Sequence, residues 1–452
     1  DLIDNTQGDG MVAGIGSVNG DLFDQDVSQT MVMSYDYMVL AGTQGLQNHR
    51  KKDRLFEIAE HNKLPTVLLA EGGGGRPGDT DTQGGAGLDC WAFTFFAKLS
   101  GLVPLVGITN GRCFAGNAVL LGCCDVIIAT KGSNIGIGGP AMIEGGGLGV
   151  FRPEEVGPVD VQYPNGVIDI LVEDEDEAMD VAKKYLSYFQ GSIKSWEAPD
   201  QRLLRHVVPE NRLRAYDVRE VIETMCDVDS VLEIRKGWGP GCVTSLARIE
   251  GRPVGIIANN NHHLGGAIDA DVGDKGSRFM QLCDAHDIPL LFLCDTPGIM
   301  VGPQAEYEAT VRHASRMFVT SASVTVPFMT VVLRKGYGLG AQAMAGGSFK
   351  APVFCVSWPT GEFGGMGLEG FVKLGYRKEL EAIDDPEERI AYYEQMVAKL
   401  YENGKAVSTA TFFELDDVID PAETRTWVSM ALRSAPKTAP REGKKRPMID
   451  TW

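Results

Sequence analysis

The residues with the clearest capacity for chemistry are glycines that follow two apolar runs of the chain. Gly72–Gly75 comes directly after the run that begins at Thr66, and Gly298 comes after the run that begins at Leu290. Glycine lets the backbone approach a ligand closely, because no Cβ lies in the way. Two backbone N–H groups aimed at one point can stabilise an oxyanion, which is often the largest single contribution to catalysis. Each turn is therefore a candidate oxyanion site, with an ordinary surface turn as the alternative.

A second glycine segment follows each turn. These segments are Arg112–Val119 (RCFAGNAV) and Lys335–Gln342 (KGYGLGAQ). If Ala115-Gly116 and Leu339-Gly340 begin helices, their free N–H groups and the positive end of the helix dipole favour a negative oxygen. Tight helix packing is the alternative reason for small residues at these positions.

The two sets of glycines recur at a fixed offset. Gly74 plus 224 gives Gly298, and Gly116 plus 224 gives Gly340. A repeat of both features in the same order is stronger evidence than either feature alone. It predicts two related domains, residues 1–205 and 206–452, each of which holds one half of a reaction.

The elements that position these glycines alternate between strands and helices. An amphipathic helix precedes each glycine turn, and buried apolar strands follow it in both halves. Strands that are apolar throughout indicate burial on both faces, with helices covering a largely parallel sheet. The fold class predicted is α/β. The paired segments are the helices Lys51–Lys63 and Lys275–Asp287, and the strands Leu102–Ile108 and Val326–Leu333, then Val126–Ala129 and Val353–Ser357.

Composition excludes several classes of protein. The chain has 452 residues with a net charge of −19, so nucleic acid or an anionic membrane is not expected as the main partner. Its nine cysteines form no CxxC pair, which predicts reduced thiols and no metal site. No apolar stretch is long enough to span a bilayer. We therefore expect no membrane partner and a cytoplasmic location, or the mitochondrial matrix in a eukaryote.

A catalytic base or nucleophile is not evident. The chain has no G-x-S-x-G motif and no GxxxxGK[ST] loop. Glu71 and Asp89 are the only carboxylates near the first glycine turn that could serve as an acid or base. The basic stretch His49–Arg54 either meets a phosphate or forms a solvated helix face.

In their order and spacing, these motifs resemble the beta-type carboxyltransferase component of biotin-dependent acyl-CoA carboxylases, in the crotonase superfamily. The strongest segment is Arg248–Gln342, which includes DKGSRFMQLCDAHDIPLLFLCDTPGIMVG, and VSWPTGEFGGMGLEG also fits. GGGGR at Gly72–Arg76 occupies the place of that family's Gly-Gly-Ala-Arg turn. The resemblance implies two tandem crotonase-like domains, each a superhelix of β-β-α units.

The resemblance also implies the reaction. The carboxyl group moves from carboxybiotin to the α-carbon of an acyl-CoA, and the biotin anion takes the α-proton, so no protein base is needed. Acyl-CoA binds mainly to the N-terminal half and carboxybiotin enters from the C-terminal half. The halves that meet belong to different subunits, so a homo-oligomer is expected, a dimer of facing halves within a hexamer.

Residue roles follow from the motif positions. The N–H groups of Gly73 and Gly74 hold the enolate oxygen, and those of Leu339 and Gly340 hold the ureido oxygen of biotin. The expected substrate-binding residues are Ala115, Gly116, Gly298, Gln342 and Arg76.

The chain departs from the family pattern at several positions. Leu339-Gly340 stands where Gly-Ala is usual, Asn117 replaces a usual Gly, and Gln342 replaces an Asp that commonly lines the acyl pocket. The loop Gly75–Asp89 is also unlike that of the short-chain enzymes. These differences favour another acyl chain length, such as a longer one, or another carboxyl acceptor.

Biotin has to come from elsewhere, because no Met-Lys-Met segment and no ATP-binding carboxylase module is present. The partners expected are a biotin carboxyl carrier and a biotin carboxylase, as domains or subunits. The start at Asp1 fits the C-terminal part of one long multidomain carboxylase. Three alternatives stay open: a biotin-dependent acyl-CoA decarboxylase subunit, a crotonase-type hydratase or hydrolase using Glu71 or Asp89, and a non-catalytic assembly scaffold.

Overall fold

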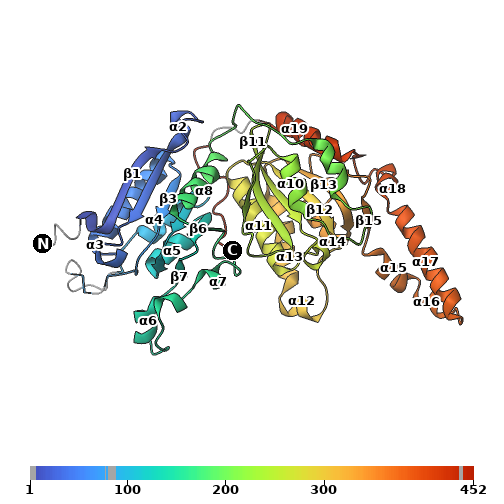
Figure 1. Ribbon diagram of the computed structural model, residues 1–452, viewed down its shortest axis with the longest axis horizontal. Coiled ribbons are helices and arrows are strands. Elements are labelled where there is room, and N and C mark those ends of the chain that lie inside the picture. The colour runs from blue at the N-terminus through green and yellow to red at the C-terminus, as the bar shows by residue number, and fades with distance from the viewer. Residues whose placement is uncertain (1–6, 77, 80–87, 437–440) are drawn as a thin grey trace.

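Two large β-sheets divide the chain into halves that lie side by side, the first blue to green and the second green to red in Figure 1. A small third sheet in the first half pairs β5 (Arg112–Phe114) with β7 (Asn134–Gly136). This computed structural model describes residues 7–76, 78–79, 88–436 and 441–452. Helices cover both sheets, so the predicted α/β class with two tandem domains is confirmed.

The first half is built on a six-stranded sheet in the order β1-β2-β3-β4-β6-β8. The first two strands pair antiparallel and the others parallel. All five residues of β4 are buried, which explains its unbroken apolar sequence. The strands are β1 (Met11–Ser17), β2 (Gln29–Tyr35), β3 (Thr66–Leu69), β4 (Leu105–Thr109), β6 (Val126–Thr130) and β8 (Ile170–Val172). The helices are α2 (Gln25–Ser28), α3 (Leu46–Asn62), α4 (Ala92–Leu99), α5 (Gly116–Gly122), α6 (Pro140–Gly145), α7 (Val159–Gln162) and α8 (Glu175–Ser187).

The second half has a larger sheet in the order β16-β14-β13-β12-β11-β10-β9, with β15 paired to the end of β13. Strands β9 to β11 pair antiparallel and the rest parallel, so neither sheet is parallel throughout. The strands are β9 (Leu232–Ile234), β10 (Cys242–Ile249), β11 (Arg252–Asn259), β12 (Leu290–Thr296), β13 (Phe328–Tyr337), β14 (Cys355–Ser357), β15 (Glu362–Gly364) and β16 (Asp417–Val418).

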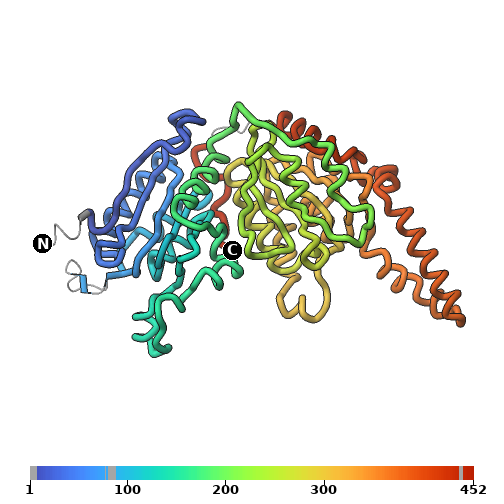
Figure 2. The backbone as a smooth tube through the Cα atoms, viewed as in Figure 1, coloured from blue at the N-terminus to red at the C-terminus, as the bar shows by residue number. Residues whose placement is uncertain are grey.

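The helices of the second half form a cover and an arm. The tube in Figure 2 shows the arm, which runs from α15 through α17, extending away from the sheet. The covering helices are α9 (Leu204–Val207), α10 (Val218–Met225), α11 (Ala270–Ala285), α12 (Pro303–Tyr307), α13 (Thr310–Ser323), α14 (Gly338–Ala343) and α19 (Thr424–Ser434). The arm comprises α15 (Leu368–Gly375), α16 (Arg377–Glu381) and α17 (Pro386–Asn403), and leads into α18 (Ala406–Thr411).

The structure repeats as the sequence does, but with a shift of one residue. Gly72 pairs with Cys113 in the first half, and Thr296 pairs with Gly336 in the second. The offset is therefore 224 at the turn and 223 at the following segment. Ala115 and Gly338 accordingly share a positive φ, 52° and 54°.

The predicted match of Gly116 to Gly340 is therefore wrong by one position. Leu339 is the counterpart of Gly116, and Gly340 is the counterpart of Asn117. The shift arises because the second half has one residue fewer between its glycine turn and the strand that leads to the helix start.

The two halves share an apolar interface. One buried cluster contains Val106 and Tyr185 from the first half together with Phe279 and Leu282 from the second. The C-terminal segment 441–452 passes between the halves, where the C-terminus lies in Figure 1. Ser100 Oγ accepts the N–H of Ile449 at 3.0 Å, which ties this segment to the first half.

The domain boundary stays a prediction. A division between residues 205 and 206 falls inside α9, and Leu204 packs in the core of the second half. This packing favours a division before Gln201, where a short 3-10 helix begins.

Candidate active site

The first glycine turn follows β3 and presses against the neighbouring backbone. A Cβ on Gly72 would lie 2.2 Å from the carbonyl oxygen of Gly42, and Gly72 has a φ of 113°. The N–H of Gly73 donates to the carbonyl of Ala41 at 3.3 Å. Among the described residues, the N–H of Gly74 has no hydrogen-bond acceptor. The turn therefore presents the N–H of Gly74 as an uncommitted donor.

The start of α5 lies against that donor. A Cβ on Gly74 would be 2.5 Å from Ala115 Cβ and 3.4 Å from the backbone nitrogen of Gly116. The N–H of Ala115 donates to the carbonyl of Gly136 at 3.1 Å, whereas that of Gly116 finds no acceptor within the described part of the chain. The structure thus brings the predicted turn and helix start together, with Gly74 and Gly116 as the available donors.

The second half makes the same contact with different donors. Pro297 has no N–H, and the N–H of Gly298 donates to Thr296 Oγ1 at 3.2 Å. The helix start supplies the donors, since the N–H groups of Leu339 and Gly340 lack acceptors in the ranges that the structure describes. Leu339 is 61% exposed, while Gly340 is buried.

Arg76 is held by the protein itself. Its guanidinium donates to Asp9 Oδ1 at 2.7 Å and to the carbonyl of Thr43 at 3.1 Å. The ion pair is largely buried, with both side chains less than one-sixth exposed. These contacts fix Arg76 and stabilise the end of the turn. Its contact with substrate stays a prediction.

Glu71 and Asp89, the two carboxylates that a hydratase could use, differ in their surroundings. Glu71 Oε1 accepts the N–H of Asn110 at 3.1 Å, which holds this carboxylate at the end of β4. Burial raises the pKa of Glu71 above its usual value. Asp89 is exposed.

Sequence reasoning missed three buried polar residues behind the first turn. Lys52, Gln44 and Asn117 form a connected set of hydrogen bonds. Lys52 belongs to the basic stretch His49–Arg54 but is fully buried, so the expectation of a solvated helix face is wrong for this residue. Asn117 had a signal, since it replaces a usual Gly, but Gln44 had none.

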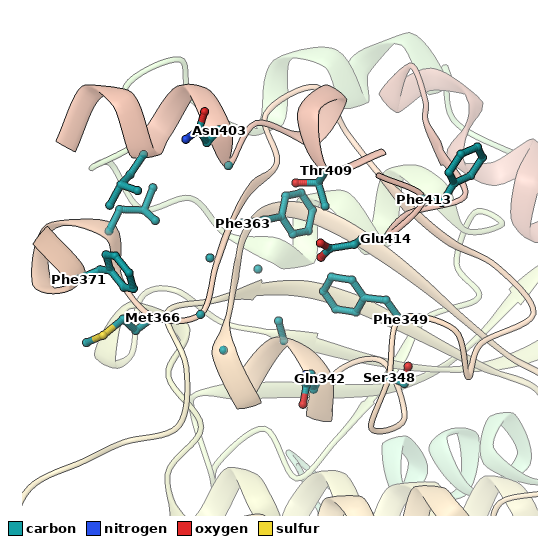
Figure 3. Close-up of a pocket in the computed structure, with 18 of the residues that line it drawn as sticks. Gln342, Ser348, Phe349, Phe363, Met366, Phe371, Asn403, Thr409, Phe413 and Glu414 are labelled. Carbon is teal, nitrogen blue, oxygen red and sulfur yellow. The ribbon is translucent and has the colours of Figure 1, made fainter. Parts of the chain in front are cut away.

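A cavity of about 640 Å³ lies beside the second helix start. Gln342, on α14, lies at one side of it, and Phe363 and Phe349 lie near its centre (Figure 3). Gly338, at the start of α14, also contributes to the wall. The apolar lining residues are Phe349, Phe363, Met366, Leu368, Phe371, Leu400 and Phe413.

Two kinds of feature are absent from the described residues. No group of three His, Cys, Asp or Glu side chains is placed to hold a metal ion. No helix there is both long and apolar enough to cross a bilayer.

Comparison with known families gives a match along the chain. The profile of the carboxyl transferase domain matches residues 3–449. The chain belongs to this family. As a carboxyltransferase, it is 34% identical over 97% of its length to the methylmalonyl-CoA carboxyltransferase 12S subunit of Propionibacterium freudenreichii subsp. shermanii, covering 83% of that protein. It is also 34% identical, over 96% of its length and 85% of the relative's, to the uncharacterized carboxylase YngE of Bacillus subtilis (strain 168).

Solved structures agree with this carboxyltransferase assignment. A single-chain, multi-domain long-chain acyl-CoA carboxylase superposes with a TM-score of 0.90 and 59% identity over 95% of this chain. The carboxyltransferase spans only 42% of that protein's length. The transcarboxylase 12S subunit superposes with a TM-score of 0.83 and 31% identity, covering 96% of this chain and 84% of that one. The predicted crotonase-like fold and the predicted enzyme class, a biotin-dependent acyl-CoA carboxyltransferase, are confirmed.

Proposed function

We propose that this carboxyltransferase moves a carboxyl group from carboxybiotin to the α-carbon of a long-chain acyl-CoA. The observation that carries the proposal is the paired contact between a glycine turn and a helix start, where each half has N–H donors without an acceptor among the described residues. The long chain is supported by the 59% identity to a long-chain acyl-CoA carboxylase and by the cavity beside α14, whose lining is mostly apolar.

In the first half, the N–H groups of Gly74 and Gly116 hold the thioester oxygen as it becomes negatively charged. Gly73 was expected to share this role, but its N–H already bonds Ala41. Gly116 takes its place because its nitrogen lies against Gly74 at the start of α5. Ala115 contributes the positive φ that turns the chain into the helix.

In the second half, the N–H groups of Leu339 and Gly340 hold the ureido oxygen of biotin. Gly298 and Gly340 pack backbone to backbone with no room for a side chain, which holds the helix start and its two N–H groups beside the turn. Carboxybiotin supplies the carboxyl group and, once that group has left, a basic nitrogen. The chain therefore needs only to bind, orient and stabilise, in agreement with the missing protein base.

The acyl tail enters the cavity beside α14. CoA is held by the first half, so the carbons beyond the reacting centre extend toward the facing second half. Gln342 and Phe363 line that space, and an aspartate at position 342 would place a charge against the hydrocarbon.

The facing halves come from two subunits of a homo-oligomer. Leu339 is largely exposed although it lies beside the reaction centre, as expected if a second subunit covers it. The 12S relative is described as a hexamer. A biotin carboxyl carrier and a biotin carboxylase, on the same chain or on partner chains, complete the enzyme. Nine free cysteines support a reducing compartment, the cytoplasm or a mitochondrial matrix.

The test is carboxyl transfer from carboxybiotin to acyl-CoAs of increasing chain length, measured as the labelled carboxyacyl-CoA product. We expect the highest kcat/KM with long chains. If none of the acyl-CoAs is carboxylated, the proposed function is overturned. A preference for propionyl-CoA would overturn the proposed chain length of the substrate. Glu71→Gln should keep most activity, whereas a hydratase that uses this carboxylate would lose it.

A further inference from the structure

A chain of three buried polar side chains lies behind the first glycine turn. Lys52, Gln44 and Asn117 are 0%, 4% and 0% exposed. Lys52 Nζ donates to Gln44 Oε1 at 2.5 Å, and Gln44 Nε2 donates to Asn117 Oδ1. Asn117 Nδ2 then donates to the carbonyls of Gly42, at 3.1 Å, and Glu71. The chain of bonds ends on the backbone that forms the turn.

The direction of these hydrogen bonds is fixed from one end. The carbonyls of Gly42 and Glu71 only accept, so the atom of Asn117 that faces them has to be its amide nitrogen. The oxygen of Asn117 then faces Gln44 Nε2, which leaves Gln44 Oε1 to accept from Lys52. Lys52 also donates to the hydroxyl of Tyr35 at 3.0 Å. Among the described residues, no carboxylate forms an ion pair with Lys52.

The three residues connect both sources of N–H donors. Asn117 is the second residue of α5, next to Gly116. The backbone of Gln44 holds both sides of the turn, because its N–H donates to the carbonyl of Gly74 at 2.7 Å and its carbonyl accepts the N–H of Arg76 at 2.8 Å. The network thus determines how the Gly74 and Gly116 donors are spaced.

The fold itself does not require this network. At the corresponding positions the second half has Gly276, Ile268 and Gly340, which carry no polar side chain. The pairing of Ile268 with Ile299 reproduces that of Gln44 with Gly75, so the backbone arrangement is the same. The polar chain is therefore a specialisation of the half that binds acyl-CoA.

We propose that Asn117 is a positioning residue for carboxyl transfer, held in the required orientation by Gln44 and Lys52. It fixes the start of α5 to the turn, so that the N–H groups of Gly74 and Gly116 converge on the thioester oxygen. The inference rests on the proposed function. It predicts an effect on the transition state, where that oxygen carries the most charge, and little effect on substrate affinity.

The sharpest test is Gln44→Glu. The new carboxylate keeps the bond to Lys52, now as a buried ion pair, but it cannot donate to Asn117. The amide of Asn117 then rotates and turns its oxygen toward the carbonyls of Gly42 and Glu71. We expect kcat to fall ~10- to 100-fold, as a misplaced donor pair implies, with KM for acyl-CoA within about threefold of wild type. The melting temperature should not fall.

Asn117→Asp is the second variant, and Asn260→Asp is the matched control. Asn260 is a buried amide of the second half that donates to the carbonyl of Pro240 at 2.8 Å. Asn117→Asp should lower kcat as Gln44→Glu does, whereas the control should change only stability. Unchanged kcat in both test variants, a loss confined to KM, or a loss that follows the melting temperature would overturn the inference.

A structural measurement separates this inference from the proposed function. If the wild-type chain carboxylates no acyl-CoA, the function fails. Crystal structures of the wild-type and Gln44→Glu proteins then still decide the positioning role. A changed separation of the Gly74 and Gly116 nitrogens supports the role, and an unchanged one refutes it.

Discussion

A methyl group on Gly340 would lie 2.7 Å from the backbone of Gly298, so the second helix start and the second glycine turn pack without room for a side chain. This contact aligns the N–H groups of Leu339 and Gly340 beside the turn. The repeat makes both glycines candidate site residues, and the family resemblance implies their roles. Their contact gives that prediction a physical basis.

Gly340→Val, whose side chain is larger than the alanine usual in the family at this position, should therefore abolish transfer while the protein stays folded. Displacing α14 moves two donors at once, and loss of a single oxyanion donor already costs about 100- to 1,000-fold in kcat. Gly122→Val is the control, because a Cβ there meets nothing within 4 Å. Steady-state kinetics measure the loss of transfer in both variants, and thermal melts show whether each variant stays folded. Equal activity of the two would contradict the role of the contact.

Gly74→Ala tests the first turn. Gly74 has a φ of 84° and would place its Cβ 2.5 Å from Ala115. We expect a destabilisation of about 1–2 kcal/mol from the backbone conformation and a larger, separate loss of kcat. Gly75→Ala, where a Cβ meets nothing within 4 Å, should have much smaller effects on both. Urea unfolding and transfer assays give the two quantities.

Gln342→Trp should shift substrate preference toward shorter chains. The larger side chain occupies the cavity next to α14, so long acyl tails lose space while short ones are unaffected. The internal control is kcat/KM for a short-chain acyl-CoA, which should stay near its wild-type value. A uniform loss across all chain lengths would mean that the tail does not enter this cavity.

Lys52 makes stability depend on pH in a defined direction. Burial lowers the pKa of Lys52 from 10.5 to about 7. Between these values the unfolded chain binds the proton that the folded chain has released, so the free energy of unfolding rises with pH. The groups around Lys52 are Tyr35, Gln44, Asp53, Asp9 and Cys90.

Lys52→Met should flatten this dependence. Urea unfolding at pH 7, 8 and 9 should show a smaller rise for the variant than for wild type. A residual slope is expected from Lys275, whose pKa burial lowers to about 8 and which is unchanged in the variant. Parallel curves for the two proteins would contradict the shifted pKa of Lys52.

The C-terminal segment should stabilise the whole chain. Lys445 and Arg446 contact the buried carboxylate of Asp284 at 3.1 and 2.9 Å. Replacing both with Met leaves that carboxylate without its cations, which should cost about 3–5 kcal/mol of unfolding free energy. Lys444→Met, at a neighbouring exposed lysine, should cost little. Chemical unfolding of the two proteins distinguishes the cases.

Local signals determined a large share of this structure. Unbroken apolar runs predicted the buried strands, so β6 at Val126–Thr130 begins where expected. The repeated glycines predicted two oxyanion sites, because a residue without a Cβ lets the backbone approach a ligand closely. The family resemblance added the reaction. Each of these depends on neighbours in the chain or on residue identity.

Tertiary structure decided which backbone groups are available. The sequence could not show that the N–H of Gly73 is hydrogen-bonded to the carbonyl of Ala41. Nor could it show that a one-residue shift makes Leu339 the counterpart of Gly116 in the repeat. Nor could it show that Lys52, on a basic stretch, is buried against Gln44. Hydrogen bonds and burial depend on which distant segments meet. Residue identity thus determined where a site could form, and long-range packing determined which of its atoms are free to act.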